Sequence, residues 1–149
     1  MTTTRSYPEP AVSVCFAVTI DDMQLGTFNS CEGLGVEVVL EQREEGGNNG
    51  FVWQLPTRLK FTNIKLTRAV CSDTSEVMAW LSSMSTGFTP KTANISALTA
   101  ERTVVASWGL LGVIPVRWTG PSLNLDSPKV ATETLELAHH GFTSAKPIS

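Results

Sequence analysis

The sequence predicts a mainly β domain with one flanking helix, built as a barrel or a sandwich around one core. Apolar and polar residues alternate in several segments, only one segment has helical apolar spacing, and Gly, Pro and Asp recur between the segments. The chain has 149 residues, of which 42% are hydrophobic and 17% are charged, as is typical of a packed globular protein. We therefore expect a single domain over residues 1–149.

The first strand signal follows an N-terminal arm, residues 1–11, which contains two prolines. Apolar side chains then occupy every second position, and this period of two predicts a strand. These residues are Val12, Val14, Phe16, Val18 and Ile20. Asp21-Asp22 predicts the turn that follows.

A second strand region has one apolar face, formed by Leu34, Val36, Val38 and Leu40. Gly33 and Gly35 interrupt it and predict a bulge or a bend. The segment REEGGNNG, residues 43–50, favours positive φ angles because it contains three glycines and two asparagines. We therefore predict a projecting loop over residues 43–56.

A third strand is predicted after Pro56, with a bulge where the apolar phase shifts by one between Phe61 and Ile64. The later part of the chain again alternates, with glycine and proline between the alternating stretches. It predicts strands over residues 92–100, 102–109, 111–118 and 129–138.

Only one segment has convincing helical spacing, with apolar residues at Val77, Leu81, Met84 and Phe88. Ser72 or Asp73 can cap its start, and Asp73 with Glu76 resembles a capping box. Gly87 and Pro90 predict its end.

The charge balance argues against a nucleic-acid or membrane surface. The net charge is −3, from 14 acidic and 11 basic residues, and no run of Lys or Arg forms a basic patch. No segment approaches the ~18–20 apolar residues of a membrane helix, and the N-terminus lacks the apolar stretch of a signal peptide. Cys15, Cys31 and Cys71 are odd in number and far apart, as suits reduced thiols. We expect synthesis and assembly in the cytoplasm, no specific nucleic-acid binding and no membrane insertion.

Both histidines lie in the stretch VATETLELAHHGF, residues 130–142, together with Glu133 and Glu136. These four side chains raise the hypothesis of a metal site or an acid–base pair. Adjacent residues on a strand point to opposite faces, however, so His139 and His140 do not converge on one ion. No neighbouring Cys or Asp pair has the spacing of zinc ligands. The stretch therefore favours a strand that ends in a polar turn.

No other segment carries a catalytic or cofactor-binding pattern. Gly33-Leu34-Gly35 lacks the third glycine and the following helix of a dinucleotide-binding loop. Nothing matches a phosphate-binding glycine–lysine loop or a nucleophile elbow. We expect no enzyme activity, no cofactor and no metal.

Four landmarks occur in an order and spacing that resemble the tail tube protein family of contractile phage tails and contractile injection systems. They are a first strand that runs into an Asp turn (FAVTIDD), Phe28 followed by CEGL, a Trp-bearing helix (EVMAWL), and the closing pattern IPVRWTGP with TETLELAHHGF. The resemblance covers about residues 12–142, which is nearly the whole chain.

The resemblance implies a β-barrel-like subunit that joins its neighbours into a continuous ring sheet. Six subunits close a ring, and rings stack into a hollow tube inside a contractile sheath. The implied partners are further copies of the chain, the sheath protein, baseplate or tube-initiator proteins, terminator or cap proteins, and a cargo of protein or DNA in the lumen. The projecting loop is implied to contact the neighbouring ring through Arg43, Glu44, Glu45, Gly46, Gly47, Asn48, Asn49, Gly50 and Phe51.

This setting suits the predicted strands, because unpaired sheet edges invite association and a closed ring removes them. We expect some polar strand positions to face the lumen, for example Ser13, Thr19, Glu37 and Glu41. The alternative hypothesis is a soluble β-barrel binding module, or a small metal-dependent enzyme that uses the region of His139 and His140. The parent particle stays open between a phage tail, an extracellular injection system, a bacteriocin-like tail and a type VI-like system.

Overall fold

The fold is mainly β with one α-helix, which confirms the predicted fold class. The computed structural model describes residues 15–21, 23–44, 52–122 and 130–143. The elements are β1 (Cys15–Ile20), β2 (Met23–Phe28), β3 (Ser30–Glu32), β4 (Val36–Glu44), β5 (Val52–Phe61), β6 (Ile64–Ala69), α1 (Thr74–Ser83), a 3-10 turn (Met84–Thr86), β7 (Lys91–Leu98), β8 (Val104–Thr119), β9 (Thr132–Ala138) and β10 (Gly141–Phe142). The predicted arm, Val12, Val14, Asp22 and residues 45–51 of the predicted loop lie outside the described residues.

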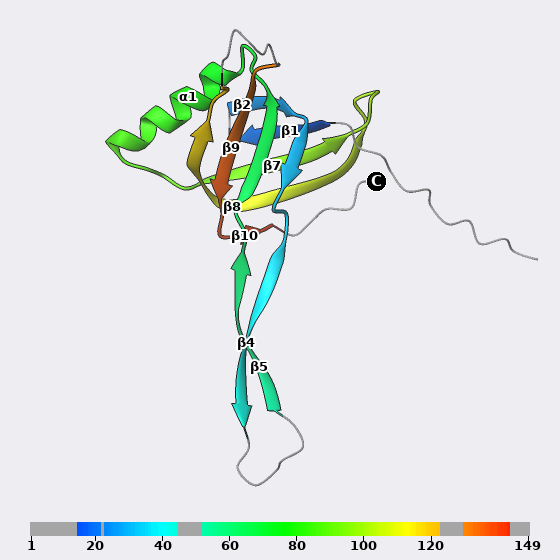
Figure 1. Cartoon of the computed structure of the whole chain (residues 1–149), viewed down its shortest axis with the longest axis vertical. Helices are drawn as coiled ribbons and strands as arrows, with labels where there is room; N and C mark the ends of the chain where they lie inside the picture. Colours follow the sequence, from blue (N-terminus) through cyan, green and yellow to red (C-terminus); the bar gives the residue numbers. More distant parts are fainter. Residues whose placement is uncertain (1–14, 22, 45–51, 123–129, 144–149) are drawn as a thin grey trace, which may run out of the picture.

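Two sheets form the body, and their strands cross at a steep angle in Figure 1. One sheet contains β2, β1, β7 and the first part of β8, to which β10 also pairs. The other contains the last part of β8, followed by β9, β6 and β3. All neighbouring strands are antiparallel, and β8 connects the two sheets. We call the β8–β9–β6–β3 sheet the front sheet.

Strand β8 changes sheets at Gly112, which has a φ of 62°. Pairing with β7 extends to Val113, and pairing with β9 begins at Ile114. The prediction of two strands, over 102–109 and 111–118, is therefore wrong. Gly112 forms a bend within one 16-residue strand and not a turn between two strands. The part of β8 up to Val113 pairs with β7, and the part from Ile114 pairs with β9.

The core lies between the two sheets and α1. Alternate residues of the strands point into it, as the period of two predicts, and each fully buried aliphatic or aromatic side chain contributes about 1.5–3 kcal/mol. The core residues are Val18, Ile20, Leu25, Phe28, Ile64, Leu66, Val77, Trp80, Ala93, Ile95, Leu110, Val113, Leu135 and Leu137.

Helix α1 covers one side of the core with Val77 and Trp80. Asp73 is its N-cap residue, but the predicted capping box is wrong because the Asp73 side chain makes no capping hydrogen bond. Its φ of −71° and ψ of −9° are helical, whereas a capping residue normally has extended dihedrals. Gly87, with a φ of 123°, follows the 3-10 turn, so Phe88 lies beyond the helix and is 62% exposed.

The predicted bulge between Phe61 and Ile64 is a break between two strands. Strand β5 ends at Phe61 and belongs to a separate two-stranded ribbon with β4, whereas β6 begins at Ile64 and belongs to the front sheet. Pro56 lies within β5, opposite Leu40, where the register of the ribbon shifts. A proline is accommodated there because ladder hydrogen bonding is interrupted at a bulge.

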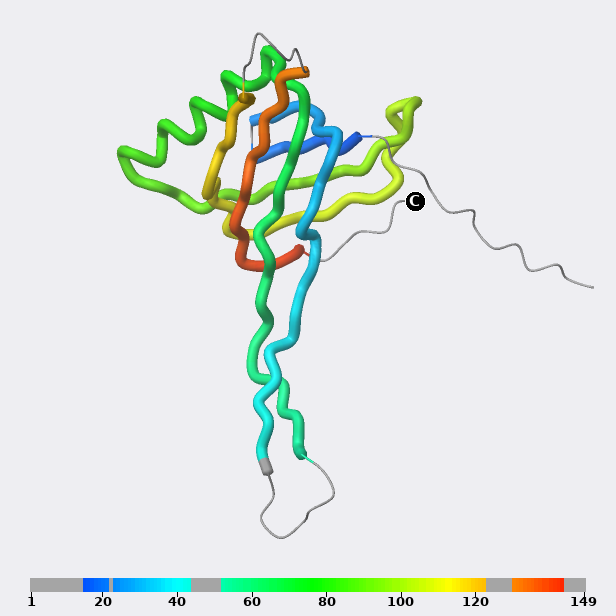
Figure 2. The backbone as a smooth tube through the Cα atoms, viewed as in Figure 1, coloured from blue at the N-terminus to red at the C-terminus, as the bar shows by residue number. Residues whose placement is uncertain are grey.

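The β4–β5 ribbon projects from the body as a long twisted hairpin (Figures 1 and 2). The predicted loop over 43–56 is too long at both ends, because its residues 43, 44 and 52–56 belong to the strands of the hairpin. A projection is present where one is predicted, but most of it is regular β structure.

Candidate assembly interface

The β4–β5 hairpin pairs almost entirely with itself. Val36 lies opposite Phe61, Glu37 opposite Lys60 and Val38 opposite Leu59, and the pairing continues to Glu44 opposite Val52. In the described part of the chain no third strand joins this ribbon. A two-stranded ribbon is marginally stable by itself in water, so a projecting hairpin of this length requires a further contact.

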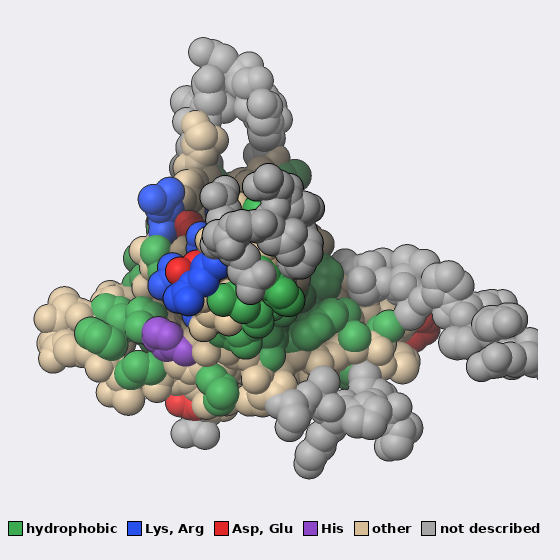
Figure 3. All heavy atoms as spheres, turned by 90° about the horizontal axis from the view of Figure 1, so that it is seen from below, with side chains coloured by type: hydrophobic (Ala, Val, Ile, Leu, Met, Phe, Trp, Pro, Cys, Tyr) green, Lys and Arg blue, Asp and Glu red, His purple; other side chains and the backbone are tan. Residues whose placement is uncertain are grey.

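In the half of the hairpin next to the body, one face is apolar and exposed. Cross-strand partners share a face, so these side chains form one stripe, and their exposed fractions are 55% for Val36, 47% for Val38, 48% for Leu40 and 57% for Leu59. The opposite face carries the charged residues Glu37, Lys60, Arg58, Glu41 and Arg43, together with Val39, Leu55 and Trp53. Seen from below, hydrophobic side chains lie on one side of the hairpin and Lys and Arg side chains on another (Figure 3). A contiguous apolar stripe of this kind marks an interaction surface.

The front sheet ends in an unpaired edge on both sides. Residues 114–119 of β8 pair with β9 on one side, and no described strand pairs with their other side, because β7 stops opposite Val113. At the far side, β6 is the one described strand that pairs with β3, and β4, which continues the same edge, has β5 as its one described partner. Unpaired edges present free N–H and C=O groups to a further strand.

The outer face of the front sheet is polar and ordered in rows. Glu32 lies opposite Lys65, Lys65 opposite Glu136, and Glu136 opposite Arg117, so the charges alternate across four strands. The next row contains only hydroxyl side chains: Ser30, Thr67, Thr134 and Thr119.

Side-chain contacts agree with the placement of these residues on one face. The hydroxyl oxygens of Thr67 and Thr134 are 3.3 Å apart, and Asn63 donates a hydrogen bond of 3.1 Å to Glu136. Lys65, Arg117 and Glu136 also line one depression of about 160 Å³ with two of the threonines. The face has equal numbers of acidic and basic residues in its charged row, so it presents no net charge to a neighbouring molecule.

The inner side of the front sheet contains a buried ion pair. Arg68 Nε donates to Glu133 Oε1 over 2.6 Å, and Arg68 Nη1 donates to the carbonyl oxygen of Leu25. Glu133 also accepts hydrogen bonds of 2.8 Å from Trp118 Nε1 and from the Thr74 hydroxyl. The pair therefore connects β6, β9, β8, β2 and the first turn of α1.

Sequence reasoning missed this ion pair, although a signal was present. Arg68 continues the inward phase of Ile64 and Leu66, and Glu133 occupies the inward phase of Leu135 and Leu137. One basic and one acidic residue on the buried face of neighbouring strands indicates a pair, because an unpaired charge is too costly to bury.

The two histidines lie in different surroundings. The His139 ring is 7% exposed and packs 5.4 Å from the Phe61 ring and 5.1 Å from the Phe142 ring, centroid to centroid. Its Nδ1 accepts a hydrogen bond of 3.3 Å from Gly141 N–H. His140 is exposed, and its N–H donates to the Leu111 carbonyl oxygen over 2.8 Å. His139 thus packs at the base of the hairpin.

These positions do not form the metal or acid–base site of the alternative hypothesis. Glu133 is committed to Arg68 in the core, and Glu136 lies on the outer face of the front sheet. Among the described residues, no three His, Cys, Asp or Glu side chains gather in a way that could hold a metal ion. The strand β9 ends at Ala138, before the histidines, as the favoured interpretation predicts.

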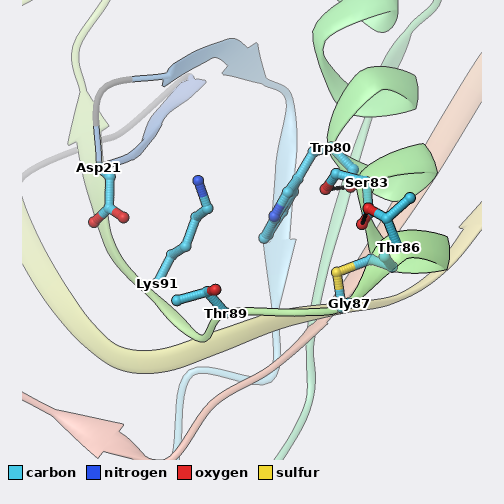
Figure 4. Close-up of a pocket in the computed structure, with 8 residues that line it drawn as sticks. Asp21, Trp80, Ser83, Thr86, Gly87, Thr89 and Lys91 are labelled. Carbon is cyan, nitrogen blue, oxygen red and sulfur yellow. Dashed lines mark hydrogen bonds between the residues drawn. The ribbon is translucent and has the colours of Figure 1, made fainter.

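A cavity of about 410 Å³ opens between the end of α1 and β7 (Figure 4). Lys91 extends across it between Asp21 and Trp80. Asp21 Oδ1 accepts a hydrogen bond of 3.1 Å from Thr92 N–H, and the hydroxyls of Ser83 and Thr86 donate to helix carbonyls. Its polar groups thus stabilise the turn and the helix end, and we assign it no chemistry.

Two of the predicted ring-stacking residues lie within the described part of the hairpin. Arg43 and Glu44 are in β4, and Arg43 Nε lies 3.7 Å from Glu41 Oε1 in an exposed ion pair. Glu45 to Phe51 lie outside the described residues. Of the side chains expected in the lumen, Thr19 lies in the other sheet, Glu37 and Glu41 lie on the hairpin, and Ser13 lies outside the described residues.

These features define a self-assembling structural β protein: the front sheet has two free edges, the hairpin has an exposed apolar face, and the outer face of the front sheet is polar. No helix in the described ranges is long and apolar enough to cross a membrane. The chain has the fold of a chain in the sheath–tube complex of PVC, an extracellular contractile injection system, with a TM-score of 0.74 and 25% identity over 92% of this chain and 90% of that one.

A chain of the tube-terminating cap structure of the anti-feeding prophage AFP has a TM-score of 0.75 and 25% identity, over 96% of this chain and 94% of that one. Hcp1 from Flavobacterium johnsoniae is more distant, with a TM-score of 0.51 and 14% identity over 87% of this chain and 93% of that one. The comparison with curated proteins finds no match.

The family described as T4-like virus tail tube protein gp19 matches residues 12–143, and the chain belongs to this family. The identification made from the sequence landmarks is confirmed. The chain is a structural subunit of the inner tube of a contractile injection system or phage-like tail. The family and the similar structures are structural tube proteins.

Proposed function

We propose that six copies of this chain close a ring by joining the two free edges of their front sheets. The single observation that carries this proposal is that one four-stranded sheet has an unpaired edge at β8 and another at β3–β4. A head-to-tail contact between two different edges forms a ring when the rotation closes. The structure of the AFP baseplate is described as 6-fold symmetrised, which supports six copies.

The polar outer face of the front sheet lines the bore of this ring. The second sheet and α1 occupy the core side of the front sheet, so they lie outside the ring. The bore is then lined by alternating charges and hydroxyl groups, among them Glu136 and Thr134. Such a surface passes cargo without binding it, because it offers neither an apolar patch nor a field of one sign.

The hairpin carries the contact between stacked rings. It projects beyond the body, its apolar face is exposed, and Arg43 and Glu44 are the last two residues of β4. Burial of this face between copies removes apolar area from water, at about 25 cal/mol per Å². The hairpin thus acquires the further contact that a two-stranded ribbon needs.

The assembled tube lies inside a sheath and is bounded by a baseplate and a terminator or cap. The similar structures come from a sheath–tube complex, a sheath/tube terminator, a baseplate and a cap, which supports these partners. The subunit is made and assembled in the cytoplasm, and the tube carries protein or DNA cargo. It acts as a conduit without catalysis.

Mass photometry and negative-stain microscopy of the purified chain over a range of concentrations test this proposal. We expect hexamers, and stacked rings or tubes at the higher concentrations. A folded chain that stays monomeric at the highest concentration contradicts the proposal.

Deletion of Gly46–Gly50 tests the stacking of rings independently of the closure of a single ring. We expect this variant to form single hexameric rings and to lose tubes, because only the connection between β4 and β5 is shortened. Tubes of unchanged length contradict the role assigned to residues 43–51.

A further inference from the structure

The second sheet of the body also has an edge strand, β2. This strand is the last in its sheet, and β1 is the one described strand that pairs with it. An edge strand offers its N–H and C=O groups to a strand of another copy. Provided that copies join into the proposed ring, the β2 edge must be closed, because pairing at β2 would compete with ring closure.

The β2 edge begins at a corner where the two sheets meet. Strand β2 ends at Phe28 and β3 begins at Ser30, so the chain passes from one sheet into the other at Asn29. Asn29 N–H donates to the Thr67 carbonyl oxygen of β6 over 2.8 Å, and Ser30 lies opposite Thr67. Backbone pairing between the sheets stops at this corner, because the described partners of β6 are β3 and β9.

A bulge interrupts the pairing of β2 close to the corner. The register between β1 and β2 shifts between Val18 and Thr19, and Leu25 is the extra residue on β2. Gly26 follows it with a φ of 93°, a left-handed value that glycine adopts without strain. The extra residue of a bulge is left unpaired by the ladder, so its backbone polar groups need another partner.

The side chain of Arg68 supplies a partner for Leu25. Arg68 Nη1 donates to the Leu25 carbonyl oxygen, so a side chain of β6 bonds the β2 backbone beyond the corner. A Cβ atom on Gly26 would lie 2.9 Å from the same nitrogen and 2.5 Å from Asp73 Oδ2, so both side chains lie directly against this part of β2. Leu25 is fully buried, and a further strand could reach its carbonyl oxygen only by displacing Arg68.

Stability alone does not require a cation at this place. A buried ion pair is often no more stabilising than apolar side chains of similar volume, because both charges lose their hydration. The guanidinium group is also incompletely bonded, since Arg68 Nη2 is buried and has no hydrogen-bond partner among the described residues. An apolar side chain, however, could not donate a hydrogen bond to the Leu25 carbonyl oxygen.

We propose that Arg68 closes the β2 edge, so that copies of this chain join through their other edges and not through β2. Glu133 accepts from Arg68 Nε, and this bond holds the guanidinium group with Nη1 directed at the Leu25 carbonyl oxygen. Both are positioning residues for assembly, because they determine which edge another copy can reach.

A neutral replacement of both charges tests this role. In Arg68→Gln, Glu133→Gln no charge is left unpaired, and the amide oxygen at position 133 can still accept from Trp118 and Thr74. Position 68 then no longer reaches the Leu25 carbonyl oxygen, because a glutamine side chain is shorter than an arginine side chain. In mass photometry over a concentration series, we expect loss of hexamers in favour of dimers and irregular oligomers.

Hydrogen exchange identifies the edge that the variant uses. At low concentration, residues 23–29 of the variant should exchange faster than those of the natural chain. At higher concentration they should become protected again, because a strand of another copy covers them. In the natural chain, protection of these residues should not depend on concentration. A role of Arg68 in stability alone would give faster exchange without this recovery.

Two further variants complete the test. Arg68→Met, Glu133→Gln replaces the first variant if that one does not fold, since Met fills more of the volume beside Phe28 and also lacks a donor. Ile95→Val controls for lost stability, because it shortens a core side chain of β7 and leaves the corner unchanged. This control should form hexamers as the natural chain does.

The outcomes separate the role of Arg68 from the proposed function. A folded charge-free variant that forms natural hexamers, with unchanged exchange of residues 23–29, overturns the role of Arg68 and leaves the ring intact. Equal loss of hexamers in Ile95→Val, without recovery of protection in either variant, also overturns it. Concentration-dependent protection of β2 in the natural chain contradicts a closed edge directly. If the natural chain forms no rings, the proposed function fails, and the recovery of β2 protection in the variant still decides the role of Arg68.

Discussion

Arg68 Nε lies 2.6 Å from Glu133 Oε1, and the two side chains are only 3% and 1% exposed. The guanidinium group also lies 4.2 Å from the centroid of the Phe28 ring, so Arg68 is held between a carboxylate and an aromatic face. Trp118, which donates to the same carboxylate, belongs to the edge of β8 that we propose to join the next copy. The ion pair therefore fixes the assembly edge to the core.

Replacement of Glu133 by Gln should destabilise the subunit strongly. The change leaves the Arg68 charge buried without a counter-charge, and loss of one partner of a buried ion pair costs about 3–5 kcal/mol. Denaturant unfolding below the concentration of ring assembly measures this loss. Glu136→Gln is the matched control, since Glu136 lies on the outer face, and its effect should stay below about 1 kcal/mol. Similar losses in the two variants contradict a dominant role of the buried pair.

The same carboxylate should make stability depend on pH in the acid range. Burial by itself raises the pKa of Glu133, but hydrogen bonds from Arg68, Trp118 and Thr74 and the Arg68 charge outweigh it, and the pKa falls below the usual 4.5. A lowered folded-state pKa stabilises the fold above the unfolded pKa, and this contribution is lost as the pH falls through the folded value. The difference in free energy of unfolding between the natural chain and Glu133→Gln should therefore shrink below about pH 4.5. A difference that is constant from pH 7 to pH 3 contradicts this assignment.

The period of two predicted most strands, because inward residues of β1, β6 and β9 alternate as a half-buried sheet requires. The same pattern was misread around Gly112, since a bend and a turn both call for glycine and only the pairing partners distinguish them. Val36, Val38 and Leu40 also alternate like core residues, yet they are exposed. Alternation of apolar and polar residues predicts that one face of a strand is buried. It does not distinguish burial within the same chain from burial against another copy. Which strands have free edges depends on the order of the strands in the sheet. The free edges of β8 and β3 therefore could not be predicted from a local sequence pattern.

Cys31 should react slowly with alkylating reagents. Burial, and then the negative charge of Glu32, raise the pKa of its thiol to about 11. At pH 8 roughly one thiol in a thousand is then ionised, and the thiolate is the reactive form. Cys71 is exposed and serves as the internal reference. Peptide mapping after brief iodoacetamide treatment should show Cys71 modified at least tenfold more than Cys31, and equal modification contradicts the assignment.

Polar replacement of the apolar hairpin face should block assembly without destabilising the subunit. The double variant Val38→Gln, Leu59→Gln makes one cross-strand pair of this face polar. Both side chains are exposed in the isolated subunit. Each aliphatic side chain that the assembly buries contributes about 1.5–3 kcal/mol, so the critical concentration for assembly should rise by at least about tenfold. Light scattering and mass photometry over a concentration series measure the shift, and thermal unfolding at low concentration should be nearly unchanged.

The matched control lies one residue away on the other face of the same hairpin. Glu37 and Lys60 are also cross-strand partners, so Glu37→Gln, Lys60→Gln introduces the same two amides at neighbouring positions. This variant should assemble at close to the natural concentration, because exposed charge pairs contribute at most about 1 kcal/mol. If both double variants lose assembly equally, the hairpin acts through its backbone or its far end, and the apolar face is not the contact. If neither loses it, the hairpin face stays in solvent in the tube.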